Sequence, residues 1–186
     1  KYGVPLDKTI FVYGGNLGKP QGINFVIDVL KRNEHENKSF FLIVGSGTEY
    51  KILEKYFSES KPNNSKLLSY LPKDEYDVLI NSCDIGLIFL DDRFTIPNFP
   101  SRILSYMQAS LPVLAATDVN TDIGDLIVDR SFGYWSKSGD LEPFFDHVKL
   151  LCDAERRKEF GENSRSTLEN LFTATHSYEI IMSHFQ

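Results

Sequence analysis

The sequence is poor in the residues that mark metal-binding, disulfide-rich and membrane-spanning proteins. Its only two cysteines, Cys83 and Cys152, form no spaced metal-binding motif, so we expect reduced thiols in a reducing compartment. No apolar run approaches the ~18–20 residues of a membrane span. No secretory leader is visible, and because the chain begins at Lys1 rather than at Met, we expect a piece cut from a longer protein.

Positive charge is also scarce, because 26 acidic residues outnumber 20 basic ones and the net charge is −6. This balance argues against a broad nucleic-acid surface, so no nucleic-acid partner is expected. It leaves room for one phosphate-sized anion site, which needs only a few local donors. The 186 residues, 41% apolar and 25% charged, are enough for one globular domain with a full core.

Short apolar runs alternate with helical patterns along most of the chain. Strands are predicted at Ile10–Tyr13, Phe40–Val44, Leu67–Leu71, Ile85–Leu90, Pro112–Ala116 and Phe132–Trp135. Helices are predicted between them, where apolar residues recur at helical spacing over 23–30, 52–56, 76–80 and 103–111. The alternation predicts an α/β fold, in which a Rossmann-like parallel sheet is flanked by helices in three layers.

The last part of the chain is predicted to be purely helical. Residues 140–186 are expected to form helices from Asp140 to about Leu151, from Ala154 to about Leu171 and from about Thr173 to Phe185. No internal repeat or flexible linker separates them from the alternating part. The whole of 1–186 is therefore predicted to be a single domain.

Because the carboxyl ends of parallel strands share one edge of a sheet, ligands bind in the loops that follow them. The first such loop contains Gly14, Gly15, Asn16, Gly18 and Lys19. Glycine lets backbone N–H groups approach an anion closely, and the lysine adds a charge. The loop matches neither the G-x-G-x-x-G nor the Walker A pattern. It fits two interpretations, an anion-binding turn or a tight strand-to-helix turn that needs positive φ.

A second glycine-rich loop, with Gly45 and Gly47, also lies between a predicted strand and a predicted helix. Its glycines leave room for a flat ring or a ribose. Ser46 or Thr48 serves equally well as the N-cap of the following helix. The sequence does not decide between these two interpretations.

The third loop, Pro97–Arg102, is stiffened by two prolines. Asn98 or Phe99 is predicted to cap a helix whose first residue is Pro100. Backbone N–H groups at the start of that helix are then free to bind an anion, and Arg102 adds a forked pair of donors. The alternative is a capped helix whose arginine is a solvated surface charge.

No other segment carries comparable chemistry. The histidines His35, His147, His176 and His184 are interpreted as surface or packing residues. Glu34, Glu36 and the Glu155–Glu159 run are interpreted as solvated faces. The sequence shows no nucleophile-base-acid set and no metal-binding cluster, so neither a metal nor a cofactor is expected.

Taken together, these loops make the chain resemble the carboxyl-terminal half of a GT-B glycosyltransferase of the large retaining class called family 4. "YGGNLGKPQG" resembles the family's glycine-rich turn, and "FLIVGSGTE" resembles its VGxG strand. "LLSYLPKDEYDVLINSCDIGLIFL" is similar to the hydrophobic block that follows, and "FPSRILSYMQASLPVLAATD" to the segment P-S-K-x-x-E-Y-M-A-x-G-x-P-V-L-A. "LLCDAERRKEFGENSR" matches the late helix pair. The motifs occur in the family's order and cover nearly the whole chain.

The resemblance implies a site for a nucleotide sugar, which is the donor substrate rather than a cofactor. The diphosphate is expected against Gly14, Gly15, Asn16, Gly18, Lys19, Ser101 and Arg102. The base and ribose are expected near Gly45, Gly47, Ser69, Tyr70, Leu71 and Ser105. The sugar is expected near Pro97, Asn98, Phe99 and the Thr117–Asp122 loop.

Several positions depart from the family's pattern. The glutamate that usually holds the ribose corresponds to Ser105, and the glutamate that usually touches the sugar corresponds to Pro97. The usual Arg and Lys of the first loop fall on Asn16 and Gln21. No catalytic residue is therefore assigned with certainty.

With these cations missing, Lys19 and Arg102 are expected to take over part of the phosphate binding. The expected function is the donor-binding domain of a bacterial-type retaining glycosyltransferase in capsule, O-antigen or exopolysaccharide synthesis, with a UDP- or GDP-linked sugar as partner. An absent amino-terminal domain would hold the acceptor, so this fragment alone is expected to be inactive. The expected location is the cytoplasm, with contact to the inner membrane face only through the absent domain. Two alternatives stay open, a non-catalytic nucleotide-binding or interaction module and half of a nucleotide-sugar epimerase.

Overall fold

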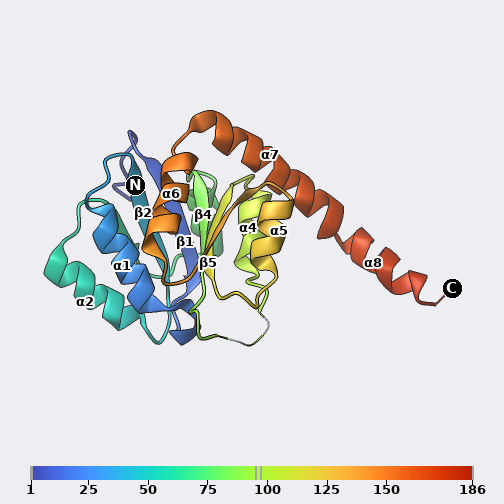
Figure 1. Ribbon diagram of the computed structural model, residues 1–186, viewed down its shortest axis with the longest axis horizontal. Helices are drawn as coiled ribbons and strands as arrows, with labels where there is room; N and C mark the ends of the chain where they lie inside the picture. Colours follow the sequence, from blue (N-terminus) through green and yellow to red (C-terminus); the bar gives the residue numbers. More distant parts are fainter. Residues whose placement is uncertain (1, 95, 97, 186) are drawn as a thin grey trace.

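The structure is an open parallel β-sheet with helices on both faces, as the alternating pattern predicts (Figure 1). The computed structural model describes residues 2–94, 96 and 98–185. Within these residues a six-stranded sheet has the order β3-β2-β1-β4-β5-β6, and neighbouring strands are parallel. The strands are β1 (Thr9–Asn16), β2 (Ser39–Ser46), β3 (Ser65–Leu68), β4 (Ile85–Phe89), β5 (Val113–Thr117) and β6 (Gly133–Lys137).

Helices follow the strands in alternation and then close the chain. They are α1 (Ile23–Asn33), α2 (Tyr50–Ser60), α3 (Lys73–Ile80), α4 (Arg102–Gln108), α5 (Ile123–Asp129), α6 (Leu141–Leu151), α7 (Ala154–Leu171) and α8 (Ala174–Ser183). A short 3-10 helix, η1 (Lys19–Gln21), precedes α1. The last three helices closely match the predicted bounds, whereas α5 has no counterpart among the predicted helices.

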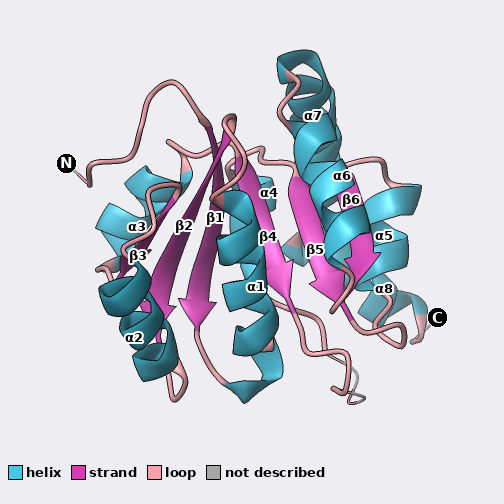
Figure 2. Ribbon diagram, turned by 60° about the vertical axis from the view of Figure 1, so that its left-hand side comes forward, coloured by secondary structure: helices cyan, strands magenta, loops and turns pink. Residues whose placement is uncertain are grey.

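Alternate residues of the central strands build two cores, one on each face of the sheet. Phe11 of β1 and Phe41 of β2 lie on one face, where their rings stack with centroids 5.0 Å apart. Helices α1, α2 and α6 cover this face, and Phe144 of α6 is fully buried against it (Figure 2). Val12 and Leu42 lie on the other face, under α3, α4 and α5. Because both faces are covered, the strands are apolar throughout, as their continuous sequence pattern predicts.

The strand order reverses between β1 and β4, which are neighbours in the sheet but not in the sequence. The connection after β1 leads to α1 on one face, and the connection after β4 leads to α4 on the other. Figure 2 shows the strands pointing towards the same edge, where these loops gather. Such a reversal separates the two loops and leaves a crevice, the usual ligand position in open α/β sheets.

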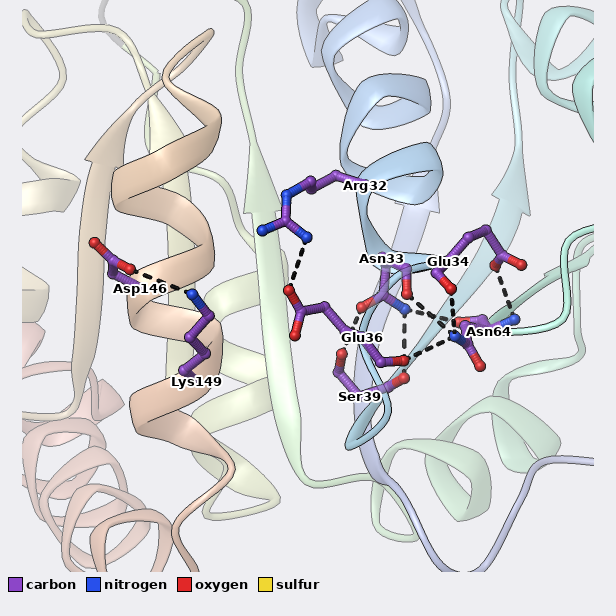
Figure 3. A network of polar contacts seen from close by, with 8 residues as sticks. All are labelled: Arg32, Asn33, Glu34, Glu36, Ser39, Asn64, Asp146 and Lys149. Carbon is purple, nitrogen blue, oxygen red and sulfur yellow. Dashed lines mark hydrogen bonds and ion pairs between the residues drawn. The ribbon is translucent and has the colours of Figure 1, made fainter.

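A polar network fastens the opposite edge, where β2 and β3 begin (Figure 3). The side-chain amide of buried Asn64 donates to the carbonyls of Asn33 (3.1 Å) and Glu36 (2.8 Å), and the Asn33 side chain donates to the Asn64 carbonyl (3.0 Å). The Glu34 carboxylate accepts hydrogen bonds from the backbone N–H groups of Asn63 and Asn64. Glu34 and Glu36 therefore join the end of α1 to the start of β3, and their interpretation as a solvated face is wrong.

The last two helices extend away from the sheet. Helix α7 approaches the end of α4 so closely that a Cβ on Gly161 would lie 2.4 Å from the Ser110 carbonyl oxygen. The buried residues of α7 are Gly161, Ser164 and Thr167, all small or polar. Helix α8 continues outwards, as Figure 1 shows, and none of its residues is buried. In the described part of the chain, no helix combines the length and the apolar character needed to cross a membrane.

His147 of α6 is half-buried, whereas His35 and His184 are exposed. The His147 ring stacks on the ring of Tyr134 of β6, with centroids 4.7 Å apart and an angle of 6° between the ring planes. The Nδ1 atom of His147 is buried and has no hydrogen-bond partner among the described residues. Burial lowers the pKa of His147, and the nearby Asp146 carboxylate partly opposes this effect.

We predict that folding stability falls as the pH drops through the ordinary histidine pKa of about 6.5. The folded chain holds His147 neutral, whereas the unfolded chain binds a proton at the ordinary pKa. The stabilisation is therefore fully present above that pKa and is lost towards the lower folded-state pKa. Urea unfolding between about pH 7.5 and about pH 5.5 measures the effect. His147→Gln, which cannot titrate, should show a weaker pH dependence, and an unchanged dependence would contradict the assignment.

Candidate functional site

A cavity of about 570 Å³ opens at the carboxyl edge of the sheet, beside the end of β1. Its walls come from the ends of β1 and β2, the loop after β3, and the starts of α3 and α4. The described residues that line it are Gly14, Gly15, Asn16, Val44, Gly45, Ser46, Tyr70, Leu71, Lys73, Tyr76, Ser101, Arg102 and Ser105. The volume lies within the range of roughly 300–1,000 Å³ typical of small-molecule sites.

The first two glycine-rich loops are held together by a close approach of two backbones. Residues 14–16 continue β1 in register with 44–46 of β2, so the predicted first turn is the end of a strand. A Cβ on Gly45 would lie only 1.8 Å from the carbonyl oxygen of Gly15. Any side chain at Gly45 would push the first loop away from the second. This glycine therefore shapes the cavity wall by packing.

Some backbone N–H groups of the first loop already have partners within the protein. The Gly14 N–H donates to the Tyr106 hydroxyl (3.2 Å), and the Gly18 N–H donates to the Gln21 side-chain oxygen (2.9 Å). These donors are not available to an anion. The loop thus offers fewer free amides than its glycines suggest, and positive charge at the cavity has to come from side chains.

The guanidinium of Arg102 supplies this charge. Its Cζ atom lies 4.1 Å from the centroid of the Tyr13 ring and would lie 3.3 Å from a Cβ on Gly15. Arg102 therefore faces the first loop rather than solvent. Its Nη1 atom is buried and has no hydrogen-bond partner in the part of the chain that the structure describes. Leaving a buried donor without an acceptor costs about 1–3 kcal/mol, and more for a charged group, which an anionic ligand would relieve.

Three buried or half-buried tyrosines, Tyr13, Tyr76 and Tyr106, lie near this guanidinium. Burial raises the pKa of each phenol, to about 12 for Tyr76, and the positive charge of Arg102 partly opposes each shift. All three phenols consequently stay neutral at physiological pH. They pack around the positive charge without cancelling it.

The lining of the cavity is basic although the chain as a whole is acidic. Among the described residues its charged side chains are Lys73 and Arg102, and no Asp or Glu lines it there. The Lys73 ammonium lies 2.7 Å from the carboxylate of Asp77, which is not part of the lining. Such an exposed pair is only weakly stabilising in water, so the lysine can turn towards a bound anion at little cost. The site is suited to a small, strongly negative group.

Two residues predicted for the diphosphate lie outside this cavity. Gly18 is buried, and the 3-10 turn that follows it carries Lys19 away from the lining. Lys19 is exposed and borders a separate cavity of about 530 Å³ together with Asp91 and Arg93. Lys19 lies away from the first cavity because the 3-10 turn directs the chain from β1 towards α1, which covers the face of the sheet opposite to α3 and α4.

Two residues predicted for the base and ribose also lie outside the lining. The space beside Gly47 is filled by the backbone of Leu17, whose carbonyl oxygen would lie 2.3 Å from an added Cβ. Ser69 is exposed just past the end of β3. Neither Ser46 nor Thr48 caps the following helix, because its N-cap is Glu49 and no side chain makes a capping hydrogen bond there.

The third loop differs from its prediction at the start of the helix. Helix α4 begins at Arg102 with Ser101 as its N-cap, rather than at Pro100. The Ile103 N–H donates to the Pro100 carbonyl at 3.1 Å, so the chain forms a tight turn before the helix proper. The helix has seven residues and spans only about 10 Å, so its two poles lie close together and partly cancel. The arginine side chain therefore contributes more positive charge here than the helix dipole.

The residues predicted for the sugar end do not line the cavity. Asn98 is half-buried, and Phe99 packs on Phe172 after the end of α7, with ring centroids 5.6 Å apart. Pro97 lies outside the described residues. The Thr117–Asp122 loop, after β5, is also absent from the lining.

Lys73 and Tyr76 of α3 line the cavity but are not among the predicted site residues. Helix α3 starts soon after β3 ends, at the edge where the predicted loops meet. A lysine and a tyrosine one helical turn apart at the start of this helix are the sequence feature that could have indicated these two residues. Val44 and Ser46, the other unpredicted lining residues, belong to the end of β2.

Residues 1–167 match the protein family described as "Glycosyl transferases group 1". The chain belongs to this family. The match runs from the amino terminus through most of α7 and so includes the whole sheet and every wall of the cavity. The resemblance drawn from the sequence motifs is thereby confirmed.

Three of the similar proteins, one relative and two solved structures, are longer than this chain. The protein named "Probable glycosyltransferase WbjE" of Pseudomonas aeruginosa is 23% identical over 172 residues, which are 92% of this chain and 42% of WbjE. HepE of Anabaena, solved in complex with UDP, has a TM-score of 0.74 at 18% identity and aligns with 95% of this chain and 48% of its own. WaaG, a glycosyltransferase involved in lipopolysaccharide biosynthesis, has a TM-score of 0.66 at 18% identity, with 94% and 46% covered. The chain therefore spans less than half of each, and its Rossmann-like fold is that of a GT-B domain.

We predict that Gly45→Ala destabilises the fold by more than about 3 kcal/mol. The added Cβ would lie 1.8 Å from the Gly15 carbonyl oxygen, and the backbone φ of +152° disfavours a side chain. Gly139→Ala is the matched control, because Gly139 has a φ of +99° but nothing within 4 Å of the added Cβ. Strain alone should cost this control about 1–3 kcal/mol. Urea unfolding of both variants measures the difference, and equal losses would show that the two loops do not pack as described.

Proposed function

We propose that this chain is the donor-binding domain of a retaining glycosyltransferase and that the 570 Å³ cavity receives a nucleotide sugar. The observation that carries the proposal is the buried Nη1 of Arg102 at the cavity wall, which has no hydrogen-bond partner among the described residues. A phosphate oxygen is the acceptor that this position lacks, since arginine binds phosphate with charge-assisted hydrogen bonds. Membership of the group 1 family supports the same ligand class.

In the proposed reaction, the bond between the anomeric carbon of the sugar and the diphosphate breaks, the acceptor hydroxyl oxygen forms the new glycosidic bond, and the proton of that hydroxyl passes to the departing diphosphate. Negative charge then grows on the departing nucleoside diphosphate. Arg102 and Lys73 stabilise that charge, and the Ser101 hydroxyl, which also lines the cavity, donates to a phosphate oxygen. The protein's contribution is electrostatic and requires no covalent intermediate with the described lining residues.

The nucleoside is proposed to lie at the other end of the cavity, along the loop after β3. Tyr70 and Leu71 line that end, and Tyr70 is 70% exposed, so its ring is free to contact a base. The described lining contains no carboxylate to hold the ribose hydroxyls, and Ser105 offers a single hydroxyl in its place. Because the similar HepE structure contains UDP, UDP is the first nucleotide to test and GDP the second.

The acceptor is proposed to bind to a further domain outside this sequence. The chain corresponds to 42% of WbjE, so more than half of that relative has no counterpart here. Transfer would occur in a cleft between the two domains, and this chain alone would bind nucleotide without turning it over. A role in the synthesis of a bacterial surface polysaccharide is supported by the description of WaaG as acting in lipopolysaccharide biosynthesis.

A second candidate function is nucleotide binding without catalysis. The absence of any Asp or Glu from the described lining favours it, because the described lining then offers no carboxylate that could act as a base. An assay of sugar transfer by the full-length protein separates the two. Transfer supports the enzyme, and nucleotide binding without transfer supports the binding module.

Arg102→Ala is predicted to weaken UDP binding by about 1.5–3 kcal/mol, which corresponds to roughly 10–150-fold in Kd. The physical reason is the loss of the charge-assisted hydrogen bonds to the diphosphate. Isothermal titration calorimetry with UDP, GDP and UDP-linked sugars measures the effect.

Arg93→Ala is the matched control for that experiment. Arg93 is an exposed arginine that pairs with Asp91 and borders the separate cavity, so its loss should leave UDP affinity unchanged. Equal affinity of Arg102→Ala and the unmodified chain would remove the arginine from the site. Tight binding of NAD, or no nucleotide binding at millimolar concentrations, would contradict the proposed function itself.

A further inference from the structure

We propose that Tyr76 is a phosphate-binding residue of this site. Its phenol hydroxyl donates a hydrogen bond to the same diphosphate that the Arg102 guanidinium binds. The inference rests on the proposed function and deepens it, because it assigns a ligand contact to a residue of α3 that is not among the predicted site residues. It also explains how a site with few free amides in its first loop can hold two phosphates.

Tyr76 and Arg102 reach neighbouring positions of the same backbone from different helices. The Tyr76 Oη lies only 1.9 Å from the place where a Cβ on Gly14 would stand. The guanidinium lies against the next residue, Gly15, with Cζ 3.3 Å from the corresponding position. Both side chains line the cavity. The missing side chain at Gly14 is what allows the phenol to reach the end of β1, so the two donors converge on one short stretch of strand.

The hydroxyl of Tyr76 differs from those of the neighbouring tyrosines in its hydrogen bonding. The Tyr13 hydroxyl donates to the Asn16 carbonyl (2.6 Å), and the Tyr106 hydroxyl donates to the Leu87 carbonyl (3.1 Å). The Tyr76 hydroxyl makes no hydrogen bond to any residue that the structure describes. It is therefore the phenol that retains a donor for a ligand.

A phenol is well suited to this position beside an arginine. Burial raises the pKa of Tyr76 to about 12, so the hydroxyl keeps its proton at physiological pH. Towards an anion it therefore acts as a hydrogen-bond donor. A hydrogen bond from a neutral hydroxyl to a phosphate oxygen is charge-assisted and short. It adds a donor without adding a second positive charge next to the guanidinium, which would repel it.

Tyr76→Phe tests the inference because it removes one oxygen and keeps the ring that packs beside Gly14. We expect the Kd for UDP to rise about 10-fold and the Kd for inorganic pyrophosphate to rise by a similar factor. The Kd for uridine, which has no phosphate, should stay unchanged. Ligand-observed NMR follows all three probes on the 186-residue chain, including those that bind weakly. Tyr50→Phe, which changes a tyrosine of α2 outside the cavity, is the matched control and should leave all three values unchanged.

Two results would overturn the inference. One is an unchanged Kd for UDP and pyrophosphate in Tyr76→Phe. The other is an equal loss for uridine and UDP, which would indicate an altered cavity shape rather than a lost phosphate contact; thermal melting of the variant detects any change in folding. If the unmodified chain binds UDP and Tyr76→Phe binds it equally well, this inference alone fails. If the unmodified chain binds no nucleotide, the proposed function fails and this inference fails with it.

Discussion

The stacking of Arg102 on the Tyr13 ring is the interaction on which the site depends. It holds a guanidinium at the end of β1, with Cζ 4.1 Å from the ring centroid. One guanidinium nitrogen is buried and has no hydrogen-bond partner within residues 2–94, 96 and 98–185. Burying an unpaired cationic donor is unfavourable, so the surrounding structure has to stabilise this arrangement. The close packing of Gly15 on Gly45 does so, because it sets the wall against which the guanidinium lies.

The fold places this arginine where a ligand can reach it. Both faces of the sheet are covered by helices, so the carboxyl edge is where loops are free to form a site. The reversal of strand order beside β1 sends the connections from β1 and β4 to opposite faces. At the other edge the Asn33–Asn64 network ties α1 to the start of β3. One edge is therefore closed by hydrogen bonds while the other carries the cavity.

The fold was largely predictable from the sequence because its signals are local. Continuous apolar runs and helical repeats mark each strand and most helices, and the acidic Asp140 marks the start of α6. The site was predictable only in part. The loops that meet at the sheet edge follow from topology, which is why Gly15, Ser101 and Arg102 were found. The direction of the chain after each strand does not follow from topology, so the sequence does not show that Lys19 of the 3-10 turn borders a separate cavity.

Two other features of the site depend on contacts between distant segments. The Gly45–Gly15 contact joins two different strands, and a sequence reading shows only that both positions are glycine. Tyr76 enters the cavity because Gly14, far away in the chain, has no side chain to exclude it. Such pairs have no local periodicity, which explains why the sequence analysis did not place α3 in the cavity wall.

The central claim is that the Arg102 Nη1 atom, which has no hydrogen-bond partner among the described residues, donates to a phosphate oxygen of the ligand. The most direct measurement is a crystal structure of the chain with UDP bound. The account predicts a diphosphate oxygen within about 2.7–3.2 Å of the Arg102 Nη1 atom, in the cavity beside Gly14 and Gly15. A UDP whose phosphates lie in the cavity of Lys19 and Arg93 instead, with the Arg102 Nη1 atom still unpaired, would contradict it.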